Sequence, residues 1–274
     1  MTRFNYFPWK KILLLALLLV IFSFLVFPLT PVAQANPFQQ LVERVRLLIN
    51  PPPRSTPTGR NRGGAGRGQF CPFIDVPVSA FVPVRQSDAD GAIATEFVWG
   101  TTVEERPTFW FYVPYAPTEG LDTAKFVLLD ADKNPVFSQP IFISLAGTPG
   151  IISFRLPEPY SLEVDKLYNW YFSIVCDAEK PSRNPGVRGW VQRVAASPEL
   201  VADLNQAAPI QKYIAYAENG IWFEMVTDLA KNLDRNPANT TLQADWLAIL
   251  AILKELNSTA LQEAPIVECC TAKN

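Results

Sequence analysis

Two segments of the chain carry the hydrophobic pattern of β-strands. From Tyr168 to Cys176 every second residue is apolar, and this period of two is typical of a strand with one buried face. Residues 108–115 (TFWFYVPY) are almost all aromatic or β-branched, which predicts a strand covered on both faces. The segment around 108–115 therefore needs a second layer of structure on its outer side.

The rest of the region 71–195 repeats the strand pattern in short pieces. Further strands are predicted at 125–129, 136–142, 151–156 and 187–194, with a hairpin turn at 130–135. Six or more short strands separated by Pro- and Gly-rich turns predict an antiparallel, immunoglobulin-like (Ig-like) β-sandwich.

The apolar period changes to that of helices after residue 196. Ser197 is a candidate N-cap, followed by proline at the first helical position, and Asn219-Gly220 and Asn236-Pro237 are candidate helix ends. The positions of Gly220, Trp222 and Pro237 resemble those of a tetratricopeptide (TPR) unit. We expect a mainly β protein with α: a sandwich at 71–195 and a TPR-like helical segment at 196–274 packed on it.

Residues 1–35 have the organisation of a cleaved signal peptide. Lys10 and Lys11 precede an apolar run at 12–27, and Ala33 and Ala35 form a small-x-small cleavage site. The alternative is an uncleaved anchor, but the run is shorter than the roughly 20 residues that span a bilayer. We expect a periplasmic, cell-envelope or secreted protein whose mature chain begins at Asn36.

A basic arm follows the signal peptide. Residues 36–49 form a short amphipathic helix with two alternative roles, docking on the body or binding at a membrane interface. Residues 50–70 are a Pro-, Gly- and Arg-rich linker, whereas the rest of the chain has an excess of acidic residues. The arm either stays solvated or contacts an anionic membrane surface, an acidic polysaccharide or an acidic protein. Because export separates the protein from nucleic acid, we expect no nucleic-acid partner.

The chain has no histidine, which excludes Ser-His-Asp and Cys-His catalysis and imidazole metal sites. The spacing of the cysteines contains no C-x-x-C pair, so we expect neither a metal nor another cofactor. In an exported protein, four cysteines indicate disulfides with three possible connectivities. We favour two bridges that join the adjacent pair Cys269-Cys270 to Cys71 and Cys176.

Aromatic residues give the best candidate binding surface, formed by Trp110, Tyr112, Trp190 and Trp222. Aromatic residues in strands more often belong to a core, so the alternative is that the C-terminal helices or a partner cover them.

Carboxylates give a second candidate. Glu104, Glu105, Glu158 and Glu163 are available for glycosidic hydrolysis, although nothing in the sequence sets two of them about a cleft. Residues 130–134 (DADKN) imitate the start of a calcium loop, but Pro135 replaces its glycine and favours a plain hairpin turn.

Several specific motifs carry a family resemblance. They are Cys71-Pro72, Val76-Pro77 and the segments 106–115, 126–130, 147–150, 168–176, 189–194 and 216–222. In these motifs the chain resembles the DUF928 family of exported cyanobacterial proteins of unknown function, over about 71–270. The resemblance implies an envelope or periplasmic setting beside other envelope proteins and makes the two-part body one evolutionary unit. It supplies no catalytic residues.

Two functions compete on this basis. We favour a non-enzymatic interaction or adaptor module that binds another envelope protein, with the basic arm as a tether. The alternative is a carbohydrate-binding or carbohydrate-active module that uses tryptophans and carboxylates.

Overall fold

The computed structural model describes residues 37–38, 40–42, 59–60, 71–72, 74–86, 96–118, 121–253 and 259–267. All of them belong to one structural unit, Asn36–Asn274. The predicted signal peptide, most of the linker, Cys269 and Cys270 lie outside the described residues.

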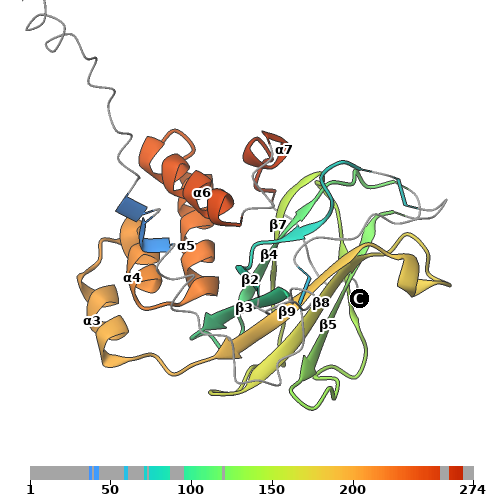
Figure 1. Cartoon of the computed structure of the whole chain (residues 1–274), viewed down its shortest axis with the longest axis horizontal. Helices are drawn as coiled ribbons and strands as arrows, with labels where there is room; N and C mark the ends of the chain where they lie inside the picture. Colours follow the sequence, from blue (N-terminus) through green and yellow to red (C-terminus); the bar gives the residue numbers. More distant parts are fainter. Residues whose placement is uncertain are drawn as a thin grey trace, which may run out of the picture. The chain divides into compact units, whose positions relative to one another are not determined.

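Nine strands form two sheets in the described part of the chain (Figure 1). The strands are β1 (Ser79–Ala80), β2 (Val84–Gln86), β3 (Glu96–Thr102), β4 (Thr108–Val113), β5 (Thr123–Asp130), β6 (Ile141–Ser144), β7 (Gly150–Arg155), β8 (Leu167–Ile174) and β9 (Gly186–Arg193). The smaller sheet has the order β1-β4-β7, and the larger has the order β2-β3-β9-β8-β5-β6. The chain is thus of mixed α and β composition, with its strands before its main helices.

One strand pair corrects the prediction of a purely antiparallel sandwich. Strands β3 and β9 run parallel, with Trp99 opposite Trp190, while the other strand pairs are antiparallel. A parallel pair needs a long connection, and β4 to β8 supply it here. Sequence periodicity carries no information on strand direction, so this pair could not be predicted.

The two sheets pack face to face through aromatic side chains. The Phe111 ring of β4 stacks on the Phe172 ring of β8, with centroids 3.9 Å apart. Phe126 of β5 contacts both Phe109 of β4 and Phe154 of β7. These side chains occupy alternate positions of their strands, as the period of two predicts.

The hairpin between β5 and β6 also differs from the prediction. The turn is present: the Asp130 carboxylate accepts hydrogen bonds from the Asn134 backbone N–H (2.7 Å) and side-chain amide (2.9 Å). These bonds hold the pKa of Asp130 below its usual value, and Lys133 adopts φ +68. However, β6 begins only at Ile141 and not at 136, because Pro140 cannot donate a ladder hydrogen bond.

The helices follow the strands. They are α3 (Pro198–Gln206), α4 (Lys212–Glu218), α5 (Trp222–Arg235), α6 (Thr240–Ile252) and α7 (Thr259–Gln262), with 3₁₀ turns η1 (Pro181–Arg183) and η2 (Pro209–Gln211). Ser197 caps α3 as predicted, since its hydroxyl accepts a hydrogen bond from the Leu200 N–H. Helix α4 ends at Asn219-Gly220, where Gly220 takes a positive φ of 71° that a side chain would disfavour.

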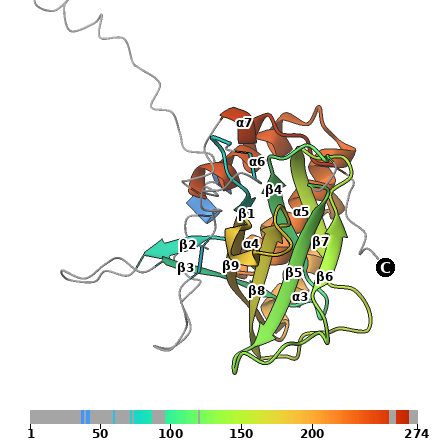
Figure 2. The same cartoon turned by 90° about the vertical axis from the view of Figure 1, so that its right-hand side faces the viewer.

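The helices pack on one side of the sheets (Figures 1 and 2). The Phe81 ring, in the turn after β1, stacks on Trp246 of α6 at 5.3 Å. Gly100 of β3 allows close approach of α5, because an added Cβ would lie 3.0 Å from the Phe223 ring. Figure 2 looks onto β5 and β8 from the side opposite the helices.

The segment after the predicted cleavage site docks on this helical layer. Phe38 and Val42 are buried, and the Phe38 ring meets the Tyr213 ring of α4 edge-on at 5.2 Å. Of the two predicted roles for this segment, docking on the body is therefore the one the described residues show. Within the described ranges, no helix is both long enough and apolar enough to cross a bilayer.

Candidate functional site

The four aromatic residues predicted to form a binding surface are buried instead. Trp110, Tyr112, Trp190 and Trp222 expose 5%, 7%, 3% and 0% of their surface. The Trp110 indole N–H donates to Thr227 Oγ1 of α5 at 2.9 Å, and that of Trp222 donates to the Phe81 carbonyl at 2.8 Å. The predicted second layer over β4 is thus the helices of this chain, and the prediction of an aromatic surface is wrong.

The opposite side of the larger sheet carries an open, positively charged concavity, here called the basic groove. Its volume is about 860 Å³. Its cationic lining residues are Arg60, Lys125, Arg183 and Arg188. Among the described residues that line it there is no acidic side chain. The groove therefore favours an anionic ligand.

Strand register explains how the groove forms. Tyr171 of β8 lies directly between Val127 of β5 and Arg188 of β9. The backbone of Arg60 pairs in turn with Arg188 through two hydrogen bonds of 2.8 and 2.7 Å. One row of residues thus crosses four chain segments, and its side chains point away from the aromatic core.

The floor of the groove is kept low by small residues. Lys125 of β5 lies opposite Ser173 of β8, which lies opposite Gly186 of β9. A Cβ at Gly186 would come within 2.8 Å of the Phe172 carbonyl oxygen and 2.9 Å of Ser173 Cβ. A larger residue here would push into the backbone of the neighbouring strand.

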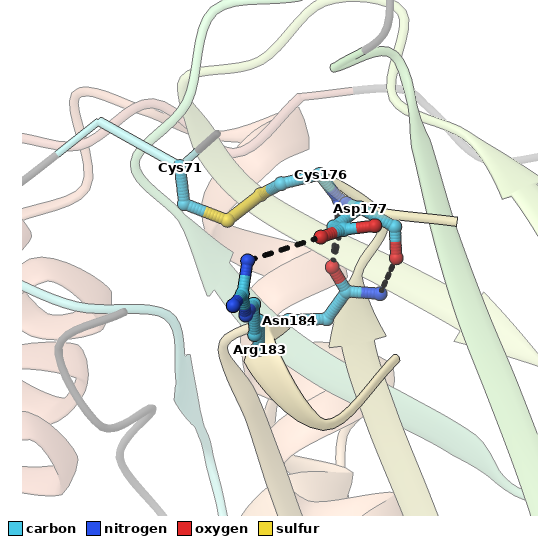
Figure 3. Close-up of a disulfide and its surroundings, with 5 residues drawn as sticks. All are labelled: Cys71, Cys176, Asp177, Arg183 and Asn184. Atoms are coloured by element: carbon cyan, nitrogen blue, oxygen red, sulfur yellow. Dashed lines mark hydrogen bonds and ion pairs between the residues drawn. A yellow bond between two sulfur atoms is a disulfide. The ribbon is translucent and has the colours of Figure 1, made fainter. Parts of the chain in front are cut away.

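The connection between β8 and β9 supplies one wall of the groove. Figure 3 shows three of its side chains, Asp177, Arg183 and Asn184. The Asn184 side-chain oxygen accepts hydrogen bonds from the N–H groups of Cys176 (3.0 Å) and Asp177 (2.8 Å). The buried Asp177 carboxylate lies 3.8 Å from the Arg183 guanidinium. This polar network gives the wall a defined shape.

The disulfide at the base of this wall corrects the predicted pairing. Cys71 is bonded to Cys176, 105 residues further along the chain, and not to the C-terminal cysteines. Sequence spacing alone could not choose among the three connectivities.

A second cavity lies between the helices and the β3–β4 region and is here called the polar cleft. Its volume is about 190 Å³. Its lining residues include acidic, basic and uncharged polar side chains: Glu104, Arg106, Thr108, Arg155, Tyr216, Glu224, Thr227, Asp228 and Lys231. Because both acidic and basic side chains line it, the polar cleft lacks the uniformly positive charge of the basic groove.

Glu224 of α5 is the most perturbed group in the polar cleft. Its carboxylate accepts hydrogen bonds from Thr102 Oγ1 (2.5 Å) and the Val103 N–H (3.2 Å). Burial, together with the nearby Glu104 charge, raises the pKa of Glu224 to about 7, although these two hydrogen bonds act in the opposite direction. Burial likewise raises the pKa of Tyr216 to about 12 and shifts that of Asp228 upward.

The four predicted carboxylates are not assembled into a pair about one cleft. Glu104 lines the polar cleft, while Glu105 and Glu158 form ion pairs with Arg106 at the surface and Glu163 is exposed. Glu224 was not identified from the sequence. The available signal was its position directly after Trp222-Phe223, because an acidic residue within an apolar stripe can be buried. In the described ranges, no three cysteine or acidic side chains are grouped to hold a metal ion.

The architecture so far defines the class: a two-sheet β protein with a helical layer on one side and a cationic concavity on the other. The profile of the family described as Domain of Unknown Function (DUF928) matches residues 62–266, well over half of the chain. The chain belongs to this family, which confirms the resemblance seen in its motifs. Among curated proteins, no significant relative was found.

Proposed function

We propose that this protein is a non-enzymatic binding module of the cell envelope and that its basic groove binds an anionic polysaccharide. The observation that carries the proposal is the convergence of Arg60, Lys125, Arg183 and Arg188 on one concavity without an acidic lining residue among those described. A polymer with repeated negative charges matches cations that come from several chain segments. We also propose that the two sheets form an Ig-like sandwich and that the helices are TPR-like, so that together they are the scaffold that carries the groove.

The lining favours a sugar chain over a protein partner. Protein interfaces are usually built around apolar anchors. The exposed large hydrophobic residues described here are Phe142, Val164, Val201 and Leu247, and the groove contains none of them. Tyr171 and the low floor at Gly186 instead offer an aromatic ring beside a flat surface, which suits a pyranose ring.

The binding test compares charged and neutral glycans. Wild-type protein is titrated with polygalacturonate and with dextran at low salt, and binding only to polygalacturonate is expected. Lys125→Glu with Arg188→Glu should weaken binding at least about tenfold, and added salt should weaken it further. Lys166→Glu is the matched control, because Lys166 is exposed and lies outside the groove. Equal binding of dextran, or unchanged affinity in the double variant, would overturn the proposal.

An acidic envelope protein is the alternative occupant, in line with the adaptor role predicted from the sequence. Cross-linked co-purification from the envelope separates the two. A defined protein that is recovered with wild-type protein and lost with the double variant would replace the glycan.

A carbohydrate-active role has one specific observation in its favour, the buried Glu224 in the polar cleft. A carboxyl group that keeps its proton near neutral pH can act as a general acid. The volume of about 190 Å³ is below the range of about 300–1,000 Å³ usual for ligand sites, so we rank this role second. Glycan cleavage that is lost in Glu224→Gln would move it to first place.

Export by a cleaved signal peptide is part of the proposal. It is supported by the organisation of residues 1–35 and by a disulfide of the kind that oxidising compartments maintain. N-terminal sequencing of the mature protein should start at Asn36, whereas a start at Met1 would contradict cleavage.

A further inference from the structure

The connection between β8 and β9 supplies a large part of the wall of the basic groove. Residues 181–185 line the groove, and they include the cation Arg183. Arg183 and Ser182 are exposed, and no strand of the sheet contains them. Their position therefore depends on what holds this connection in place.

Two side chains hold it from within. Asn184 bridges the two ends of the connection: its oxygen accepts from Cys176 N–H and Asp177 N–H, and its amide donates to the Asp177 carbonyl at 3.1 Å. Asp177 closes the turn, because its Oδ1 accepts from the N–H groups of Glu179 (3.0 Å) and Lys180 (2.9 Å). Its other oxygen faces Arg183 at 3.8 Å.

One covalent bond ties this network to the rest of the body. Cys176, whose N–H is held by Asn184, is bonded to Cys71, which comes directly after the predicted linker (Figure 3). The same few residues therefore join the disulfide, the hydrogen-bond network and the groove wall.

We propose that the Cys71–Cys176 disulfide makes the basic groove redox-dependent: the oxidised protein holds Arg183 in the wall, and reduction releases it and weakens binding of the polyanion. Asn184 and Asp177 act as positioning residues for Arg183. This inference rests on the proposed function of the groove and adds its regulation.

The chemistry needs an external dithiol. A thiolate of the dithiol attacks one sulfur of the disulfide, which forms a mixed disulfide and releases the other cysteine. The second thiolate of the dithiol then attacks the dithiol's own sulfur in the mixed disulfide and releases the remaining cysteine. Two electrons and two protons pass to Cys71 and Cys176, which become thiols, and the dithiol becomes a cyclic disulfide.

The first test measures polygalacturonate affinity of full-length protein before and after treatment with dithiothreitol. The Cys71→Ser/Cys176→Ser variant removes the bond genetically, and Cys269→Ser/Cys270→Ser is the matched control that keeps it. A loss of about tenfold or more is expected in the reduced protein and in the first variant, but not in the control. Unchanged affinity of folded reduced protein overturns the inference.

A second variant covers the case in which loss of the bond unfolds the chain. Asn184→Ala keeps the disulfide and removes the three hydrogen bonds of the Asn184 side chain. Ala178→Ser is the matched control, because it changes an exposed position of the same connection that does not line the groove. Asn184→Ala should show the tenfold loss and Ala178→Ser should bind as the wild type. Wild-type affinity in Asn184→Ala overturns the inference.

Amide hydrogen exchange separates this inference from the proposed function. Exchange within 177–185 should accelerate in Asn184→Ala even where no ligand is added. If the wild type binds no polyanion, the proposed function is wrong. If exchange within 177–185 is unchanged in Asn184→Ala, the positioning role of Asn184 is wrong and the proposed function is unaffected.

Discussion

The two sides of the sheets are built on opposite principles. On the helix-covered side, Trp110 and Trp222 are buried and their indole N–H groups have partners across the interface. On the open side, Lys125, Tyr171 and Arg188 are only half-buried, and they line a groove of about 860 Å³. The first side holds the fold together, and the second is available to a ligand.

The two sides also differ in the environment of their charged groups. The helix-covered side also contains a buried acid, Glu224, whose pKa is raised to about 7 because burial disfavours its charged form. The cations of the open side line the groove instead of the core. Changes on the covered side should therefore affect stability, and changes on the open side should affect binding.

The largest expected effect comes from truncating a covered aromatic residue. Trp222 is fully buried and donates to the Phe81 carbonyl, so Trp222→Ala should lower the free energy of unfolding by about 3–5 kcal/mol. Tyr171→Ala, in the groove, should cost less than about 1 kcal/mol. Urea denaturation of both variants checks the comparison, and equal losses would contradict it.

The next effect is a pH dependence caused by Glu224. Its pKa is about 7 in the folded protein and near 4.5 in the unfolded chain, so between these values the folded state holds one proton more. Stability should therefore fall by about 3 kcal/mol as the pH rises from below 4.5 to above 7. The folded form of Glu224→Gln keeps a neutral hydrogen-bonding group at every pH.

Thermal and urea unfolding between pH 4 and 8 measure this effect. The Glu224→Gln variant should show a flatter profile and exceed the wild type in stability near pH 8. Glu163→Gln serves as the control, since Glu163 is exposed. A wild-type slope that Glu224→Gln leaves intact would disprove the assignment.

A smaller effect is expected where one hydrogen bond crosses between sheet and helix. Thr227→Val leaves the Trp110 indole N–H without its acceptor, which should cost about 1–3 kcal/mol. Thr227→Ser retains the hydroxyl and should recover most of this loss. Chemical denaturation of the two variants shows whether the free energy of unfolding depends on the hydrogen bond to Trp110 or on side-chain packing at residue 227.

The smallest effect on stability should come from the groove charges. Lys125→Glu should change the free energy of unfolding by no more than about 0.5 kcal/mol, because it alters a solvated charge. Its melting temperature should therefore match that of the wild type while polyanion binding falls. A large destabilisation would mean that the groove is part of the core.

Sequence patterns predicted the elements better than the site. The period of two located β8, the double-sided pattern of β4 predicted a second layer, and Ser197 and Gly220 marked helix ends. The basic groove could not be predicted, because strand pairing brings residues 60, 125 and 188 together and the β8–β9 connection adds residue 183. The raised pKa of Glu224 likewise depends on burial by distant residues, and the Cys71–Cys176 bond was one of three open choices.

The most direct test of the account is a hydrogen-exchange footprint of polygalacturonate on the full-length protein. Bound polymer should slow exchange at 171–173 and 183–188 in the groove and leave the helical layer at 198–252 unchanged. Slowed exchange around Glu224 and Tyr216 without any change in the groove would contradict the central claim and place the ligand in the polar cleft.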